Sequence, residues 1–95
     1  MIVLKVDMLV KPGTEAKCRE YIRILQEHSR KEPGCLLYIG HQSTEDPRKF
    51  LFHENWTSKA HLDAHLKNTH IQVLLPRLDE LCVGMPEITT WDKIA

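Results

Sequence analysis

The sequence predicts one α+β domain over residues 1–95, with strands and helices in the order β-α-β-β-α-β. Three observations support this prediction. A chain of 95 residues is enough for one modest hydrophobic core. Four short segments alternate apolar and other residues, as strands do, and two regions between them repeat apolar residues at helical spacing. This order is that of the ferredoxin-like arrangement, in which helices cover one face of a four-stranded antiparallel sheet.

The first third of the chain predicts a strand followed by a helix. Ile2 to Val10 alternates with a period of two. After a Pro-Gly turn, Thr14 is a candidate N-cap for a helix that runs to about Lys31. The apolar face of this helix consists of Cys18, Tyr21, Ile22 and Leu25. Glu32-Pro33-Gly34 ends the helix, because the residue before a proline avoids helical dihedrals and glycine tolerates positive φ.

Three further segments predict strands. Cys35 to Ser43 and Phe50 to Trp56 flank the turn signal Thr44-Glu45-Asp46-Pro47, so we expect these two strands to form an antiparallel hairpin. Glu87 to Trp91 has the composition of a last strand.

A second helical region lies between the third and fourth strands. Thr57-Ser58 offers N-cap candidates for a short helix from Ala60 to Leu66. Thr69-His70 is expected to interrupt it, and helical spacing resumes from Ile71 to Cys82. Within this last stretch, Pro76 is expected to kink the helix or to open a new turn.

Charge and hydropathy exclude some classes of binding partner. The 13 basic and 13 acidic residues balance and are spread along the chain, so nucleic acid is not an expected partner. No apolar run approaches the roughly 20 residues of a membrane span, and the N-terminal residues lack a charged leader, so we expect a cytoplasmic protein without a membrane partner. The three cysteines are widely spaced, and we expect all of them to be reduced.

The second predicted strand is apolar on both faces, because Cys35, Leu37 and Ile39 alternate with Leu36 and Tyr38. Helices can cover only one face of the sheet. We therefore expect a homodimer in which the other face is buried against a second copy.

Phe52, Glu54 and Trp56 are expected on one face of the third strand, beside the following helix. A buried carboxylate costs several kcal/mol unless it is paired or protonated, so Glu54 is a candidate functional residue. The alternative is that Glu54 lies at the rim of the sheet and accepts hydrogen bonds from a neighbouring His or Trp.

Three of the six histidines lie within ten residues. His61 and His65 are one helical turn apart, a spacing that can chelate a metal, but no third ligand is evident and we expect no bound metal. His65 lies between Leu62 and Leu66 on the apolar side of its helix and should face Glu54, where an imidazole can act as a base. The alternative is a histidine at the edge of the core that donates to a backbone carbonyl.

The ordered motifs resemble one family over most of the chain. They are Glu32-Pro33-Gly34-Cys35-Leu36-x-Tyr38, Asp46-Pro47, Phe50-x-Phe52-x-Glu54-x-Trp56 and Ala60-x-Leu62-x-x-His65-x-x-x-x-His70. In this order and spacing they look like the antibiotic biosynthesis monooxygenase (ABM) domain, which includes quinol monooxygenases. The resemblance implies a dimeric α+β barrel and oxidation of a small aromatic hydroquinone or phenol by O2 with no cofactor, since a deprotonated phenol can itself pass an electron to O2.

The resemblance also implies roles for individual residues. His65 would take the hydroxyl proton, oriented by Glu54 or replaced by it as the base. Trp56, with Phe52 and Tyr38, would hold the aromatic ring. His70, at the interruption between the helices, would bind an oxygen atom or gate the pocket. Asn55 is left out, because alternation places it on the opposite face from Trp56.

Other functions remain open at this stage. Haem-degrading relatives use an Asn on the first strand, and residues 2–10 contain none. Relatives that isomerise phosphorylated signals would need basic residues in the pocket, and the pocket strands supply few. A non-catalytic ligand-binding or stress-response domain on the same fold is the remaining alternative.

Overall fold

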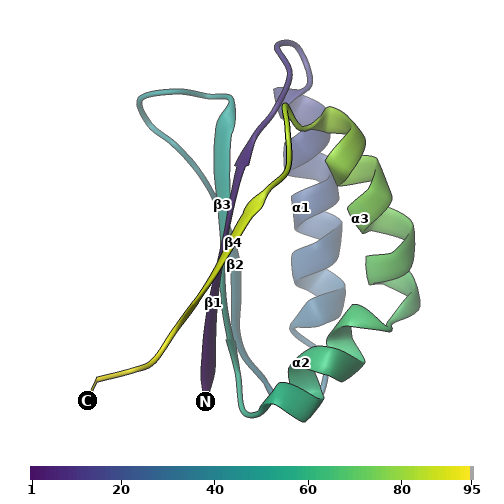
Figure 1. Ribbon diagram of the computed structural model, residues 1–95. Coiled ribbons are helices and arrows are strands. Elements are labelled where there is room, and N and C mark those ends of the chain that lie inside the picture. Colours follow the sequence, from purple (N-terminus) through teal and green to yellow (C-terminus); the bar gives the residue numbers. More distant parts are fainter. Residues whose placement is uncertain (95) are drawn as a thin grey trace.

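The structure is a computed structural model that describes residues 1–94. One antiparallel sheet carries all of the helices on one of its faces (Figure 1). The elements are β1 (Ile2–Leu9), α1 (Glu15–Ser29), β2 (Cys35–Gln42), β3 (Lys49–Trp56), α2 (Lys59–Leu66), α3 (Thr69–Leu81) and β4 (Glu87–Trp91). The predicted ferredoxin-like α+β fold is therefore confirmed.

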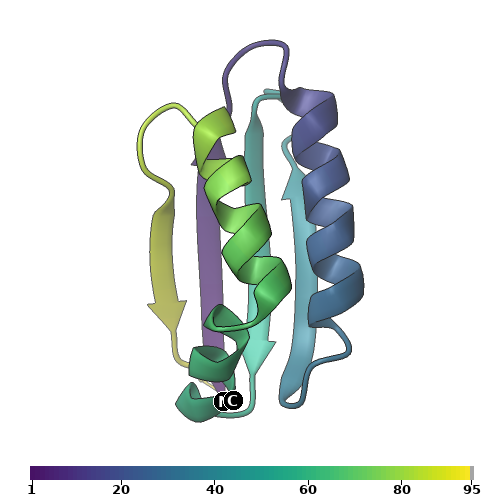
Figure 2. The same ribbon diagram turned by 90° about the vertical axis from the view of Figure 1, so that its right-hand side faces the viewer.

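The strand order is β2-β3-β1-β4, with antiparallel pairing throughout. Glu54 on the central strand β3 pairs with Leu4 on one side and with Tyr38 on the other. In Figure 2 the helices lie in front of the sheet, while β4 forms an edge that no helix covers.

The core lies between this helix-covered face and the helices. Alternate residues of β1 and β3 point inward, and α1 and α3 each contribute an apolar stripe. The side chains with almost no exposed surface are Trp56, Leu25, Ile71, Leu78, Val10, Cys18 and Ser29. The three cysteines are free thiols, as expected.

Of the two predicted helix caps, one needs correction. Thr14 stands at the N-cap of α1, but its dihedrals are not extended and its hydroxyl donates instead to the carbonyl of Lys11, 2.7 Å away. The carboxylate of Glu15 accepts the N–H of Gly13 instead. At the second helix the prediction holds, since the backbone N–H of His61 donates to the Ser58 hydroxyl over 3.3 Å.

The interruption of the second helical region also differs from the prediction. It falls at residues 67–68, so that Thr69 and His70 are the first two residues of α3. Pro76 lies within α3, and the helix continues to Leu81. A proline inside a helix costs about 3 kcal/mol, and burial of Ile71, Leu74 and Leu78 on the same helix offsets that cost.

The opposite face of the sheet has no helix over it. It presents Val3, Leu37, Ile39 and Leu51, all only partly buried, and 55% of Trp91 is exposed. Within residues 1–94, no helix combines the length and the hydropathy that a membrane crossing requires.

Candidate functional site

A cavity of about 260 Å³ lies between the sheet and the two C-terminal helices. Its wall is mostly apolar. The lining residues are Leu4, Val6, Met8, Tyr38, Phe52, Glu54, His65, Leu66, Ile71, Leu75, Leu78, Asp79, Met85, Pro86 and Ile88. Glu54 contributes the buried carboxylate and His65 the buried imidazole among them, so proton transfer in this cavity would centre on these two side chains.

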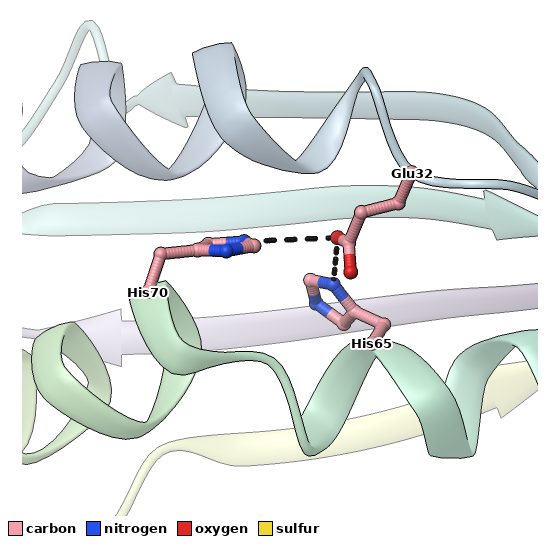
Figure 3. Close-up of side chains that lie close together, drawn as sticks. All are labelled: Glu32, His65 and His70. Carbon is pink, nitrogen blue, oxygen red and sulfur yellow. Dashed lines mark hydrogen bonds and ion pairs between the residues drawn. The ribbon is translucent and has the colours of Figure 1, made fainter.

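His65 is held in place from two sides. It lies on α2, whose first turn is capped by Ser58, and only 3% of the residue is exposed. Its ring centroid is 4.4 Å from that of Trp56. Its Nδ1 lies 2.5 Å from Oε2 of Glu32, in the segment that follows α1 (Figure 3). An ionised Glu32 accepts the Nδ1 proton, which leaves the lone pair on Nε2.

Glu54 is buried in an inner strand and not at the rim of the sheet, but it does accept a hydrogen bond from a Trp, as the alternative supposed. Its Oε1 accepts the indole N–H of Trp56 over 3.0 Å and lies 3.8 Å from Nε2 of His65. Burial raises the pKa of Glu54 to about 7, and the charge of Glu32 acts in the same direction. A carboxyl with this pKa can hold or release a proton at neutral pH.

Burial lowers the pKa of His65, although the hydrogen bond and the charge of Glu32 oppose that shift. The lowered pKa favours the neutral imidazole, which can accept a proton at Nε2. Burial also raises the pKa of the Tyr38 phenol, which stays protonated and cannot serve as a base.

The other residues singled out in the sequence fall into two groups. Tyr38 and Phe52 line the cavity, with their ring centroids 5.3 Å apart. Trp56 and His70 lie outside the lining. Trp56 has no exposed surface and contacts Glu54 and His65. Asn55 pairs with Val3 on the opposite face, as expected.

Glu32 is the residue of the site that sequence reasoning missed. It was interpreted only as part of the stop signal of the first helix. The available signal was its place at the head of the family-like motif, at the junction where α1 turns toward the sheet. Because Gly34 follows with φ +81°, the chain reverses there, and the carboxylate lies against α2.

His61 and His65, whose spacing could chelate a metal, do not lie together in the structure. Nδ1 of His61 lies 2.9 Å from the Thr57 hydroxyl and 2.8 Å from the Ser58 hydroxyl. Over the described residues, the donor set that a metal could use consists of Glu32, His65 and His70, with ligand atoms within 4.8 Å of one another. In this structure these atoms contact each other directly.

A model of the family described as antibiotic biosynthesis monooxygenase matches residues 1–76. A curated relative from Synechocystis sp., Uncharacterized protein sll1783, is 33% identical over 97 residues that cover 99% of this chain. The chain spans 63% of the length of that relative.

Solved structures agree with this family match. A crystal structure of an antibiotic biosynthesis monooxygenase is 27% identical, with a TM-score of 0.94 and 100% of both chains covered. A conserved protein from Methanosarcina mazei Go1 is 28% identical, with a TM-score of 0.92 and coverage of 97% of this chain and 91% of that one. The chain belongs to the antibiotic biosynthesis monooxygenase family and has its monooxygenase fold.

Proposed function

We propose that this protein is a cofactor-independent monooxygenase that oxidises a small aromatic hydroquinone or phenol with O2. One observation carries the proposal: a largely apolar cavity is lined by the imidazole of His65, whose Nδ1 is bound by the carboxylate of Glu32. Such a site can bind a ring, remove a hydroxyl proton and keep water away.

The reaction balances without a further reductant. Nε2 of His65 takes a proton from a ring hydroxyl, and the resulting phenolate passes one electron to O2. The phenoxyl radical and superoxide then combine to form a C–O bond at a ring carbon. His65 returns its proton to the terminal peroxide oxygen. Hydroxide then leaves as the O–O bond breaks and takes up the proton lost from the same ring carbon, which gives a hydroxyquinone and water. One hydroquinone and one O2 thus give one hydroxyquinone and one H2O, with all four electrons from the substrate.

Each polar group at the inner wall has a role in this scheme. Glu32 fixes the tautomer of His65 and stabilises the imidazolium that forms. Glu54, held by Trp56, is the alternative base, since its pKa of about 7 also suits proton transfer at neutral pH. Tyr38 and Phe52 offer ring faces and edges for an aromatic substrate.

The cavity favours a small, uncharged ligand. Its volume of about 260 Å³ is below the roughly 300–1,000 Å³ range of pockets for drug-sized ligands, which suits one or two fused rings. No Lys or Arg of residues 1–94 lines it, which argues against a phosphorylated substrate of the isomerase kind.

We also propose that the active form is a cytoplasmic homodimer, joined through the uncovered face of the sheet. A shallow groove of about 550 Å³ crosses this face and is lined by Val3, Lys5, His41, Leu51, His53 and Trp91. Apolar surface of this kind is typical of an interface between copies. The free thiols fit a reducing compartment.

Oxygen uptake tests the activity. Purified protein, treated with a chelator and free of flavin and haem, is mixed with a panel of benzo- and naphthohydroquinones, and spontaneous autoxidation is measured beside it. We expect faster O2 consumption and a hydroxyquinone product that carries ¹⁸O from ¹⁸O2. Tight binding of a hydroquinone without turnover would instead identify a ligand-binding domain, and turnover only after added flavin or iron would refute the cofactor-free mechanism.

A further inference from the structure

Glu32 contacts two imidazoles with the same oxygen. Its Oε2 lies 2.5 Å from Nδ1 of His65 and 3.6 Å from Nε2 of His70 (Figure 3). The three side chains come from the segment after α1, from α2 and from the first turn of α3. They form a row, which we call the Glu32 row, and in it a carboxylate lies between two histidines.

The Glu32 row runs from the cavity toward the surface. The exposed fraction of the side chain is 3% for His65, 10% for Glu32 and 17% for His70. Beyond His70, the exposed His28 stacks on the His70 ring with 5.4 Å between centroids. The first residue of the row lines the cavity and the last one is reached by solvent.

A ligand in the cavity would block the route by which a proton on His65 could reach solvent through the cavity. Apart from Glu54, His65 and the phenol of Tyr38, the wall is apolar up to Asp79, so few polar groups remain on that side once a ligand fills the cavity. On the protein side, the polar groups around the row are Ser29 of α1, whose hydroxyl lies 3.2 Å from Nε2 of His70, together with Tyr38, Cys35 and Glu54 near Glu32. The row is thus a chain of titratable side chains that leads from the buried imidazole toward solvent.

We propose that Glu32 and His70 pass protons between His65 and solvent, so that His70 is the exchange point of the catalytic base. A proton accepted at Nε2 of His65 lets the Nδ1 proton move to Oε2 of Glu32, and from there to Nε2 of His70. Once His70 gives up its proton to water, His65 is neutral with its proton on Nε2, and Glu32 keeps its own charge. When the Nε2 proton later goes back to the oxygen intermediate, the reverse transfer returns a proton from solvent to Nδ1, so one turnover exchanges protons with solvent but takes up none in net. The proposal rests on the proposed function only for the source of the proton.

One distance sets the condition for this transfer. The contact between Glu32 and His65 is already a hydrogen bond, but the 3.6 Å between Glu32 and His70 is longer than one. The His70 side chain must approach by about 0.5 Å, or a water must bridge, for the proton to pass. Its position in the first turn of α3, at the protein surface, allows that movement.

Exchange of the ring proton tests the proposal without any substrate. The Nδ1 proton of His65 in ¹⁵N-labelled protein is observed by NMR, and its exchange with water is measured by saturation transfer. We expect His70→Gln, which keeps a polar side chain but cannot relay a proton, to slow this exchange roughly 10- to 100-fold, an effect at the low end of general acid–base contributions. The matched control is His61→Gln, four residues before His65 on α2 and outside the row, and it should leave the exchange unchanged.

Chemical rescue separates proton transfer from a structural effect. In His70→Ala, added imidazole should restore the exchange of the His65 ring proton, while the backbone amide exchange of α2 stays as in the wild type. Unchanged ring exchange in His70→Gln, or a slowing that imidazole does not restore, would overturn the proposal.

The same variants distinguish a failure of the proton relay from a failure of the proposed oxygenase function. If no hydroquinone is turned over but the ring exchange depends on His70, the row stands and the oxygenase function fails. If hydroquinones are turned over while His70→Gln changes neither the turnover nor the ring exchange, the function stands and the row fails.

Discussion

Nδ1 of His65 lies 2.5 Å from Oε2 of Glu32, although 33 residues separate the two in the chain. This contact joins the end of α1 to α2 across the edge of the core. It determines which ring nitrogen carries the proton, and the predictions about activity depend on it.

Replacing His65 with Ala removes the proposed proton acceptor. General-base losses are typically about 100- to 10,000-fold, and we expect the loss in kcat with little change in KM. Hydroquinones ionise without help at high pH, so the defect should shrink there. The measurement is O2 uptake between pH 6 and 10, with His61→Ala as the control; a His65→Ala rate within about threefold of wild type at neutral pH would make Glu54 the base.

Glu32→Gln tests whether Glu32 determines which ring nitrogen of His65 carries the proton. A Gln side chain can present its NH2 group to Nδ1 of His65, and this favours the tautomer that has its proton on Nε2 and no lone pair toward the cavity. We expect kcat to fall about 100-fold, close to the lower His65→Ala limit, with KM nearly unchanged. The ¹⁵N chemical shifts of the His65 ring report the tautomer directly, and shifts identical to the wild type would exclude this role for Glu32.

Glu54→Gln should stabilise the protein at alkaline pH. The folded-state pKa of about 7 lies above the ordinary value of 4.5, so the contribution of this carboxyl to stability is fully present below pH 4.5 and is lost as the pH rises through 7. At about 1.4 kcal/mol per pKa unit, the variant gains up to roughly 3 kcal/mol over wild type at pH 8.5 and little at pH 4.5. Urea unfolding at the two pH values measures this, and the exposed Glu27→Gln is the control; a difference that does not vary with pH would contradict it.

Two glycines with similar backbone angles form a matched pair. Gly13 and Gly34 have φ of +88° and +81°. A Cβ at Gly13 meets nothing within 4 Å, whereas one at Gly34 would overlap the ring of His61. Gly13→Ala should cost about 1–2 kcal/mol from the backbone alone, and Gly34→Ala distinctly more in thermal unfolding. Because α2 carries both His61 and His65, only Gly34→Ala should also lower turnover.

The proposed dimer interface can be tested with single charges. Leu51 lies on the uncovered face of the sheet, while Val73 lies on the outer side of α3 with 47% of its surface exposed. Leu51→Asp should give a monomer in sedimentation at micromolar concentration, whereas Val73→Asp should keep the wild-type mass. If the wild-type protein sediments as a monomer, the proposed dimer interface is wrong.

Most of the fold could be predicted because local patterns agree with the tertiary structure. The last strand, Glu87–Trp91, has the bounds expected from its composition. Alternation along β3 placed Glu54 and Trp56 on the helix side, and helical spacing placed His65 opposite them. What failed was the detail that depends on backbone angles, such as the side-chain cap at Thr14.

The site could be predicted only in part, because its geometry depends on long-range packing. Nothing in the neighbourhood of Glu32 indicates that α2 brings His65 against it. Likewise, Trp56 was expected to hold the substrate ring, and only the packing of Tyr38 and His65 around it shows that its surface is fully covered. Contacts between distant segments leave no periodic trace in a single sequence.

The two-residue interruption at Lys67–Asn68 has a geometric consequence for the histidines on either side of it. In an uninterrupted α-helix, residues five apart point about 140° away from each other, since each residue turns the helix by about 100°. His65 and His70 are five apart, yet both reach one oxygen of Glu32. The length of the interruption is therefore a directional constraint: inserting or deleting a single residue there would turn one imidazole away while leaving both helices and the core beneath them intact.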